Sequence, residues 1–159
     1  MLGLKRFTAL CLVATASFAA DSPFVGTWKV DLAKSKDLPG TAYKEDQMTF
    51  QAIGDQWKRV AKGIDADGKE YSEDSTVAWD GKDHPTQEGV TVAIIVVGAR
   101  AIKITVKHDA KILIVGRLVV SKDGRNMTVY AKGVDEKGCK VDSVDVYHSS
   151  ECPGAILGT

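Results

Sequence analysis

The residue types that most often carry chemistry are few in this chain of 159 residues. The three histidines, His84, His108 and His148, are predicted to lie in a turn and at two strand ends, and no two have a spacing that would place both on one metal ion. Cys139 has no histidine near it in the sequence, so a thiolate–base pair is not indicated. We therefore predict no catalytic residue, no metal site and no cofactor.

Two acidic patterns are candidates for other chemistry. The stretch DADGKE, residues 65–70, resembles a calcium loop, but the EF-hand pattern needs a third acidic ligand before the glycine and a glutamate at its last position. We interpret it as a hairpin turn. Glu73 and Asp145 would form a carboxylate pair only if both side chains point inward and lie close together. A hydrolytic enzyme is accordingly the third and least favoured of three functional hypotheses.

The elements that must position these residues are strands and tight turns. Almost every segment after Gly26 alternates between apolar and polar residues or is a short apolar run. The connections DADGK, SKDGRN and DEKGC contain the Asp, Gly and Asn that hairpins prefer. The predicted strands are residues 26–33, 45–53, 56–63, 70–79, 89–97, 101–108, 111–121, 125–134 and 139–148. This pattern predicts an all-β fold, a single antiparallel up-and-down β-barrel of about eight to ten strands with little helix.

An internal repeat supports a meandering sheet. Residues 52–68 align with residues 122–138 at an offset of 70, so that Gly54 meets Gly124 and one Ala-Lys-Gly triplet meets another. The repeated unit is strand, turn, strand, turn, strand. Chance reuse of hairpin turns is the alternative explanation. In either case the period is that of an up-and-down sheet, which tends to close because closure removes exposed edges.

The alternation of residues along these strands indicates which side chains point inward. Arg59 lies between the apolar Trp57 and Ala61, and Glu73 shares a strand face with Tyr71. Buried charge is costly unless it is paired or solvated, which favours a hollow barrel; alternatively, Arg59 and Glu73 lie near the barrel mouths and reach water. The predicted ligand-binding residues are Phe50, Trp57, Arg59, Tyr71, Glu73 and Tyr147, with Trp28 at the floor. The face of the last strand stays open, because Val144 and Val146 would also suit the interior.

The stretch PFVGTWKV, residues 23–30, resembles a known family signature. It is similar to the Phe-x-Gly-x-Trp pattern that opens the first strand in the calycin superfamily, which contains the lipocalins and the fatty-acid-binding proteins. The resemblance implies that Trp28 closes one end of the barrel and that a ligand enters at the other. Gly26 would let the chain bend where the strand enters. GTWKVDLAKSK, WDGKDHP and VVSKDG also resemble a group of exported bacterial lipocalin-like proteins of largely uncharacterised function.

The chain departs from the fatty-acid-binding proteins at two places. Those proteins carry an Arg-x-Tyr pair in the final strand that holds the ligand carboxylate, and the corresponding residues here are Asp145-Val146-Tyr147. An acid in place of that arginine argues against a fatty-acid carboxylate at this position. Residues 34–44 are also too few for the two helices of a lid.

Charge and the two chain ends limit the location and the partners. Lys and Arg number 21, as do Asp and Glu, and they are interleaved, so we predict no nucleic-acid partner.

The basic, then apolar, then small residues of 1–19 predict a cleaved signal peptide, and the apolar run is too short to span a membrane. We expect a secreted or periplasmic protein with a lipocalin-like domain at 20–150 and a flexible tail at 151–159. A strand at 141–148 would carry Cys152 away from Cys139, so we expect free thiols or an intermolecular bridge.

Two functional hypotheses rank above catalysis. The first is an exported protein that binds a small hydrophobic or amphipathic ligand in the barrel cavity. The alternative is an envelope or extracellular interaction module without a ligand. Residues 90–104, VTVAIIVVGARAIKI, are apolar on both faces, which calls for cover on each side. A partner, a second copy in a homodimer, or the segment 32–43 would each provide that cover.

Overall fold

The computed structural model describes residues 22–37, 42–135 and 137–150, and within them it shows an antiparallel barrel without a helix. The predicted leader and tail lie outside these residues. Ten strands form one sheet: β1 (Gly26–Val30), β2 (Glu45–Ile53), β3 (Gln56–Ile64), β4 (Glu70–Ala78), β5 (His84–Gln87), β6 (Val90–Gly98), β7 (Ala101–His108), β8 (Lys111–Val120), β9 (Asn126–Val134) and β10 (Lys140–Ser149). None of the described residues belongs to a helix long and apolar enough to span a membrane.

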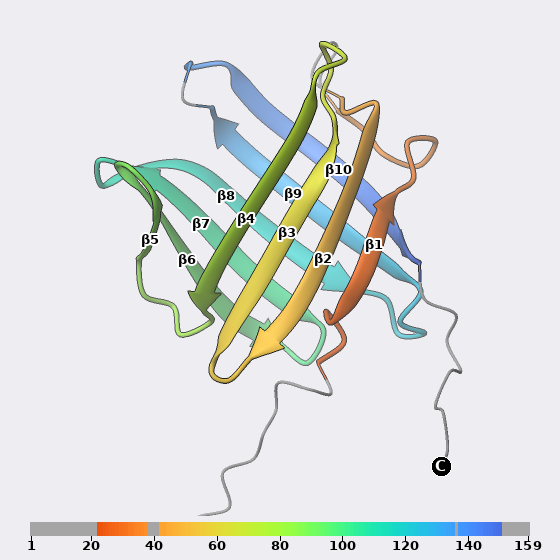
Figure 1. The fold of residues 1–159 in the computed structure, drawn as a ribbon, viewed down its shortest axis with the longest axis horizontal. Helices are drawn as coiled ribbons and strands as arrows, with labels where there is room; N and C mark the ends of the chain where they lie inside the picture. Colours follow the sequence, from red (N-terminus) through yellow and green to blue (C-terminus); the bar gives the residue numbers. More distant parts are fainter. Residues whose placement is uncertain (1–21, 38–41, 136, 151–159) are drawn as a thin grey trace, which may run out of the picture.

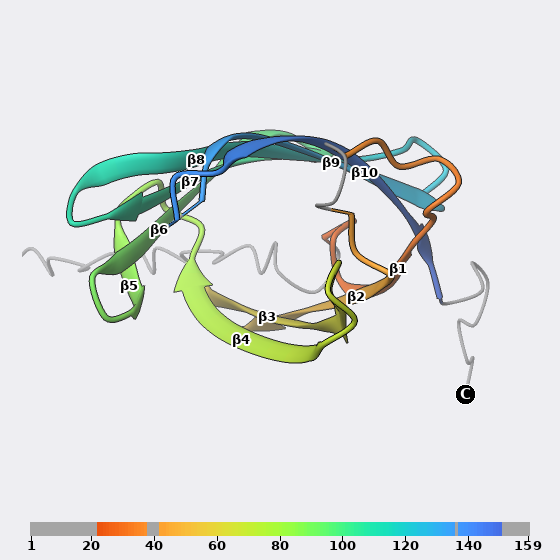
Figure 2. The ribbon, with the colours of Figure 1, turned by 90° about the horizontal axis from the view of Figure 1, so that it is seen from above.

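Consecutive strands pair with one another at every step except one. The order in the sheet is β4-β3-β2-β1-β10-β9-β8-β7-β6-β5, so β1 closes the ring against β10 while β4 and β5 remain its two edges (Figure 1). The edges meet where a backbone bridge joins Asp80 to Ile95 and the Gly81 N–H donates to the Ile94 carbonyl at 2.9 Å. Seen from above, the strands surround the interior and leave this one side of the ring unpaired (Figure 2). The predicted up-and-down barrel is therefore confirmed as a nearly closed one.

The strand predictions differ from the structure at two places. The first strand ends at Val30 rather than at residue 33, because a turn begins at Asp31 and its carbonyl accepts from the Lys34 and Ser35 N–H groups. Segment 31–37 then runs beside β10, with a bridge from Lys36 to Val144. Segment 32–43 was one of the predicted covers for residues 90–104; residues 32–37 of it lie beside β10 instead, and residues 38–41 are outside the described residues. The short strand β5 was missed, since its proline and turn-like surroundings concealed it.

The internal repeat is confirmed by equivalent hydrogen bonds at the same positions of its two turns. The Asp65 carboxylate accepts from the Asp67 and Lys69 N–H groups at 3.0 and 2.8 Å. The Asp135 carboxylate accepts from the N–H groups of residues 137 and 139 at 2.9 and 2.7 Å. The stretch DADGKE is thus a turn that its own aspartate holds, as its interpretation as a hairpin predicted.

The repeated glycine of each Ala-Lys-Gly triplet marks a close approach of two backbones. A Cβ on Gly63 would lie 2.0 Å from the Glu45 carbonyl oxygen, and one on Gly133 would lie 1.9 Å from the Leu113 carbonyl oxygen. Only glycine fits at either position without movement of the neighbouring strand. The repeat therefore reflects strand packing as well as turn chemistry.

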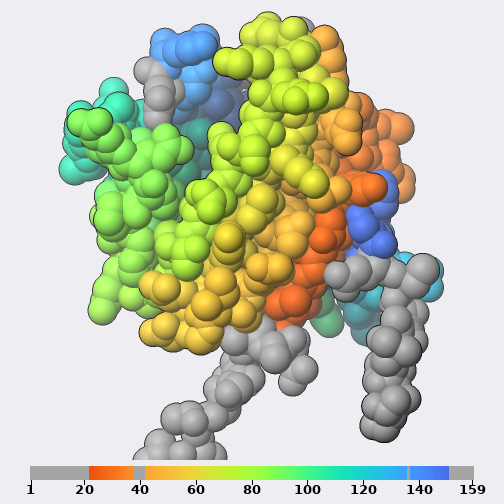
Figure 3. Space-filling model, viewed as in Figure 1, coloured from red at the N-terminus to blue at the C-terminus, as the bar shows by residue number. Residues whose placement is uncertain are grey.

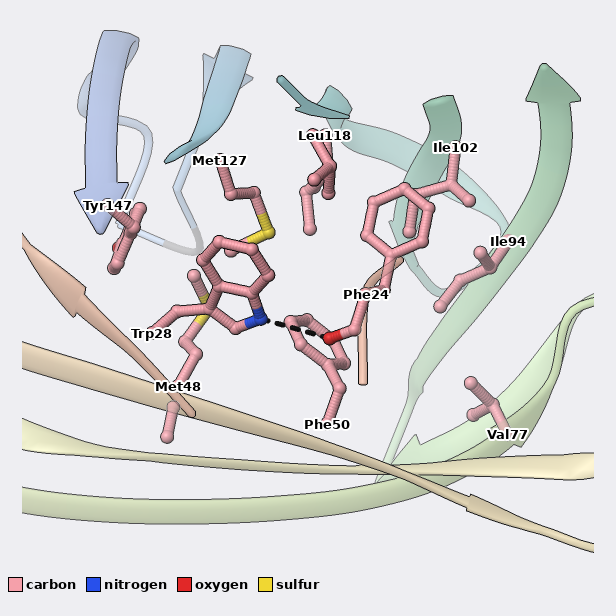
Figure 4. Packing of buried hydrophobic residues seen from close by; sticks show 12 residues of the cluster. Phe24, Trp28, Met48, Phe50, Val77, Ile94, Ile102, Leu118, Met127 and Tyr147 are labelled. Carbon is pink, nitrogen blue, oxygen red and sulfur yellow. Dashed lines mark hydrogen bonds between the residues drawn. The ribbon is translucent and has the colours of Figure 1, made fainter. Parts of the chain in front are cut away.

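One end of the barrel holds a solid core. Trp28 is 2 % exposed and its indole Nε1 donates to the Phe24 carbonyl at 2.9 Å (Figure 4). Gly26 has a φ of 123°, which is the conformation that the bend at the strand entry requires. The side chains around Trp28 come from both walls of the barrel, and they include Met48, Phe50, Ile102, Leu118, Met127 and Tyr147. Trp28 thus fills the closed end, as the sequence resemblance implied.

Candidate functional site

Above this core the barrel contains a cavity of about 360 Å³. One wall is aliphatic and comes from β6 to β9; its residues are Val92, Ile94, Ile104, Val106, Ile114, Leu118 and Val129. The facing wall, from β3 and β4, contributes Arg59, Glu73 and Ser75. Figure 3 shows the hollow between the yellow-green residues of β4 and the green residues of β5 and β6. An apolar enclosure with a few polar groups on one side is the usual form of a small-molecule site.

Aromatic rings form the base of the cavity. Trp57 and Trp79 stack with ring centroids 3.9 Å apart and an angle of 10° between their planes. Phe50 meets Trp79 edge-on at 6.4 Å, and Phe24 does so at 5.4 Å. Such rings offer a large rigid apolar surface whose π-faces also attract cations. Trp79 is not among the predicted binding residues, although it continues the alternation of Tyr71, Glu73 and Val77 along the same strand.

Arg59 and Glu73 point into the cavity and also reach water. Arg59 Nη1 lies 3.8 Å from Glu73 Oε2, and the two side chains are 35 % and 58 % exposed. Arg59 lies opposite Ser75 in the register of β3 and β4, and Glu73 is the next inward residue along β4. The barrel is therefore hollow at this point, and the two charged side chains also reach water, as the two sequence interpretations had it. Both hold because the unpaired side of the ring exposes part of the cavity wall. A pair this exposed adds little to stability.

Tyr71 and Tyr147 face the interior but do not line the cavity. Both phenol groups donate hydrogen bonds to the buried carboxylate of Asp46, one to each oxygen. Burial is the main cause that raises the pKa of both tyrosines, and Asp46 raises it further. The three side chains come from β4, β2 and β10, so they connect strands that do not pair with one another. Sequence reasoning found the two tyrosines but not the aspartate that binds them.

Asp145 shows which face of the last strand, β10, points inward. It is 7 % exposed and Tyr147 is 3 % exposed, so these residues of β10 point inward while Val144 and Val146 point outward. Burial, and then the nearby Asp37 carboxylate, raise the pKa of Asp145 to about 6. The Asp145 carboxylate also accepts a hydrogen bond from the Ser143 hydroxyl at 3.1 Å, which acts in the opposite direction on its pKa. The interior beside the cavity is thus rich in carboxylates.

Of the seven predicted site residues, four line the cavity and three do not. Phe50, Trp57, Arg59 and Glu73 are in its wall. Tyr71 and Tyr147 lie beside it on Asp46, and Trp28 lies below it in the core. The cavity residues that sequence reasoning missed are chiefly those of the aliphatic wall. Several of their strands are apolar on both faces, so the alternation of residue types does not indicate which side chains point inward.

The other groups considered for chemistry are separate from the cavity. His84 Nε2 lies 2.8 Å from Asp80 Oδ1, and His108 Nε2 lies 3.8 Å from Asp109 Oδ2. Cys139 is exposed with a free thiol, whereas Cys152 lies outside the described residues. Among the residues that the structure describes, no three His, Cys, Asp or Glu side chains are grouped to hold a metal ion.

A second hollow lies on the outer face of the barrel. It is a groove of about 540 Å³ across β6 to β9, lined by Val97, Lys103, Val115, Gly116, Arg117, Tyr130 and Lys132. Arg117 lies on this outer face. Ile95, Val97 and Tyr130 are 48 %, 49 % and 45 % exposed. This part of the predicted two-faced apolar run has no cover from the described part of the chain.

Comparison with known proteins identifies the fold but not a family. No protein-family model matches the chain, and comparison with curated protein sequences finds no relative. The barrel is similar to zebrafish ileal bile acid-binding protein complexed with cholic acid (TM-score 0.53, 10 % identity, 80 % of this chain and 99 % of that one). It is also similar to a fatty-acid-binding protein from Manduca sexta (0.51, 14 %, 79 % and 99 %) and to Rv2717c from M. tuberculosis (0.52, 15 %, 82 % and 94 %). These likenesses concern the fold alone: the chain shares an up-and-down barrel with these three proteins.

Proposed function

We propose that this protein binds a small hydrophobic or amphipathic molecule in the cavity of its barrel and that it does so as an exported carrier or sensor without catalysis. The observation that carries the proposal is the cavity itself: an aliphatic wall faces Arg59, Glu73 and Ser75 above stacked tryptophans. A purely structural barrel would fill this space with side chains, because protein interiors are close-packed. The folds of a bile acid-binding and a fatty-acid-binding protein support the same use of the interior.

Native mass spectrometry of the protein, purified from cells that export it, tests the proposal. We expect an extra mass of the size of a small metabolite that is lost when the same sample is denatured. The mature mass measured in the same experiment tests the cleavage of residues 1–19. A bare chain that also fails to bind a neutral environment-sensitive dye such as Nile red would contradict a binding function.

The outer groove favours self-association as a second candidate function. Exposed apolar side chains gathered on one sheet face are typical of interaction surfaces. Among the described residues neither Lys103 nor Arg117 forms an ion pair, so a two-fold dimer over this face would bring like charges together. We therefore expect a dimer that tightens with added salt and is lost in Val97→Glu, measured by analytical ultracentrifugation. A monomer at all concentrations and salt levels would contradict this candidate.

A further inference from the structure

We infer that the cavity takes a cationic amphiphile, an apolar chain or ring system that carries one amine, and that Glu73 receives the positive group. This inference rests on the proposed function, because it names the class of ligand for the same cavity. It follows from three features of the interior: which polar groups face the cavity, which sign of charge prevails, and where the Glu73 carboxylate lies relative to the apolar wall.

The polar groups available to a ligand are few. No fully buried side-chain nitrogen or oxygen of the described residues lacks a hydrogen-bond partner. Both carboxylate oxygens of Asp46 accept hydrogen bonds from tyrosines, so this carboxylate is not available to a ligand in the cavity. The charged side chains that line the cavity are those of Arg59 and Glu73, with the Ser75 hydroxyl beside them on β4. A ligand head group must therefore meet the Arg59–Glu73 pair.

The interior around that pair carries an excess of negative charge. Asp46 and Asp145 are buried, Glu73 faces the cavity, and the Asp37 carboxyl meets Asp145 from segment 31–37. Against these, Arg59 is the cation in the cavity wall. Its charge already acts on the neighbouring tyrosines Tyr43 and Tyr71. A carboxylate ligand would compete with Glu73 for Arg59 and would enter the field of the other acids, whereas a cation is attracted by the same field.

The position of Glu73 suits a ligand with a charged head and an apolar body. Its side chain is 58 % exposed on the edge strand β4, so a cationic head group can pair with it while remaining partly hydrated. Along the same face of β4 the chain continues through Ser75 and Val77 to Trp79, about 20 Å away at the rise of a strand. The apolar body can therefore lie between the aliphatic wall and the tryptophan stack.

Three probes with the same chain and different heads test the inference: dodecylammonium, dodecanol and dodecanoate, each displacing Nile red at concentrations at which the probe is monomeric in solution. We expect dodecylammonium to bind about tenfold more tightly than dodecanoate, with a preference that decreases as salt is added. Glu73→Gln should remove most of this preference and leave dodecanol unchanged. Arg59→Gln should enlarge it, because Glu73 then loses its partner; loss of structure alone would not give opposite effects.

Asp74→Asn is the matched control, because Asp74 is the next residue of β4 and its side chain is 73 % exposed on the outer face. It should leave all three affinities unchanged. If Nile red and all three probes fail to bind, the proposed binding function is contradicted. If the probes bind but dodecanoate equals or exceeds dodecylammonium, or if Glu73→Gln does not alter their ratio, binding stands and the charge inference is overturned.

Discussion

Asp145 is the residue whose ionisation most clearly opposes the folded state. It lies inside the barrel, and the charged groups that face it are the carboxyls of Asp37 and Asp46. Burial and Asp37 together raise the pKa of Asp145 to about 6 from an ordinary value of 3.8. The folded protein therefore keeps a proton that the unfolded chain releases between these two values. Its contribution to stability is present at low pH and is lost as the pH rises through about 6.

We expect Asp145→Asn to increase the free energy of unfolding at pH 8, because the amide carries no charge to be buried beside the Asp37 carboxyl. A pKa difference of this size corresponds to at most about 3 kcal/mol. The measurement is urea unfolding of both proteins from pH 4 to pH 8, and the difference between them should grow through pH 6. Asp142→Asn on the outward face of the same strand is the control. Parallel curves for wild type and Asp145→Asn would contradict the prediction.

Trp28 and Asp46 show how unequally the sequence reveals individual residues. Trp28 was assigned to the closed end because it follows Gly26 in a recognisable spacing, and it is buried there. Asp46 is the second residue of the alternating strand β2, and its inward direction could be inferred from Met48 and Phe50. Its two partners, however, lie 25 and 101 residues away along the chain. Contacts of that kind depend on the register of strands that do not pair with each other, which alternation alone does not provide.

At the scale of the elements, the β2–β3 hairpin offers a test of two different glycine requirements. Gly63 has no room for a Cβ, which would lie 2.0 Å from the Glu45 carbonyl oxygen. Gly54 has open space around it but a φ of +61°. We expect Gly63→Ala to lower the free energy of unfolding by about 3 kcal/mol, since β2 must move. Gly54→Ala should cost about 1 kcal/mol, from backbone conformation alone.

Urea unfolding of the two variants compares these costs within one hairpin. Gly133→Ala, the repeat partner of Gly63→Ala, should be similarly damaging because its Cβ would lie 1.9 Å from the Leu113 carbonyl oxygen. Equal, small effects at Gly54 and Gly63 would show that the close approach is not rigid. The repeat would then reflect turn chemistry only.

The strands were largely predictable because their alternation and turn residues are local signals. The bounds of eight strands, all except β1 and β5, agree with the predicted ranges to within one residue at either end. The strand β5 was not predicted, since four residues with a proline carry little periodicity. The unpaired side between β4 and β5 was not predicted either, because the sequence does not state which neighbouring strands fail to form a ladder. That opening exposes Glu73 to water. Because of it, the side chains beside Glu73 line an accessible cavity instead of a closed core.

At the scale of the whole molecule, the barrel divides into a packed end and a hollow one. Trp28 and its neighbours fill the first, while the cavity occupies the space between the β3–β4 wall and the aliphatic wall. The two parts share side chains such as Phe50 and Leu118, whereas Arg59, Glu73 and Ala131 line the cavity without belonging to the core cluster. Ligand binding is therefore compatible with substitutions in the cavity wall that leave the fold intact.

We expect Ala131→Leu to separate stability from binding, because Ala131 lines the cavity on β9 and a larger apolar side chain there would occupy ligand space. The free energy of unfolding should rise by about 1 kcal/mol, as cavity-filling substitutions commonly produce. Nile red affinity should decrease at least tenfold, measured by fluorescence titration. Thr128→Leu, on the outer face of the same strand, places the same side chain outside the cavity and should leave dye affinity unchanged. If dye affinity survives Ala131→Leu while Val97→Glu on the outer groove abolishes it, the apolar site lies outside the barrel, and the outer face becomes the better candidate for function.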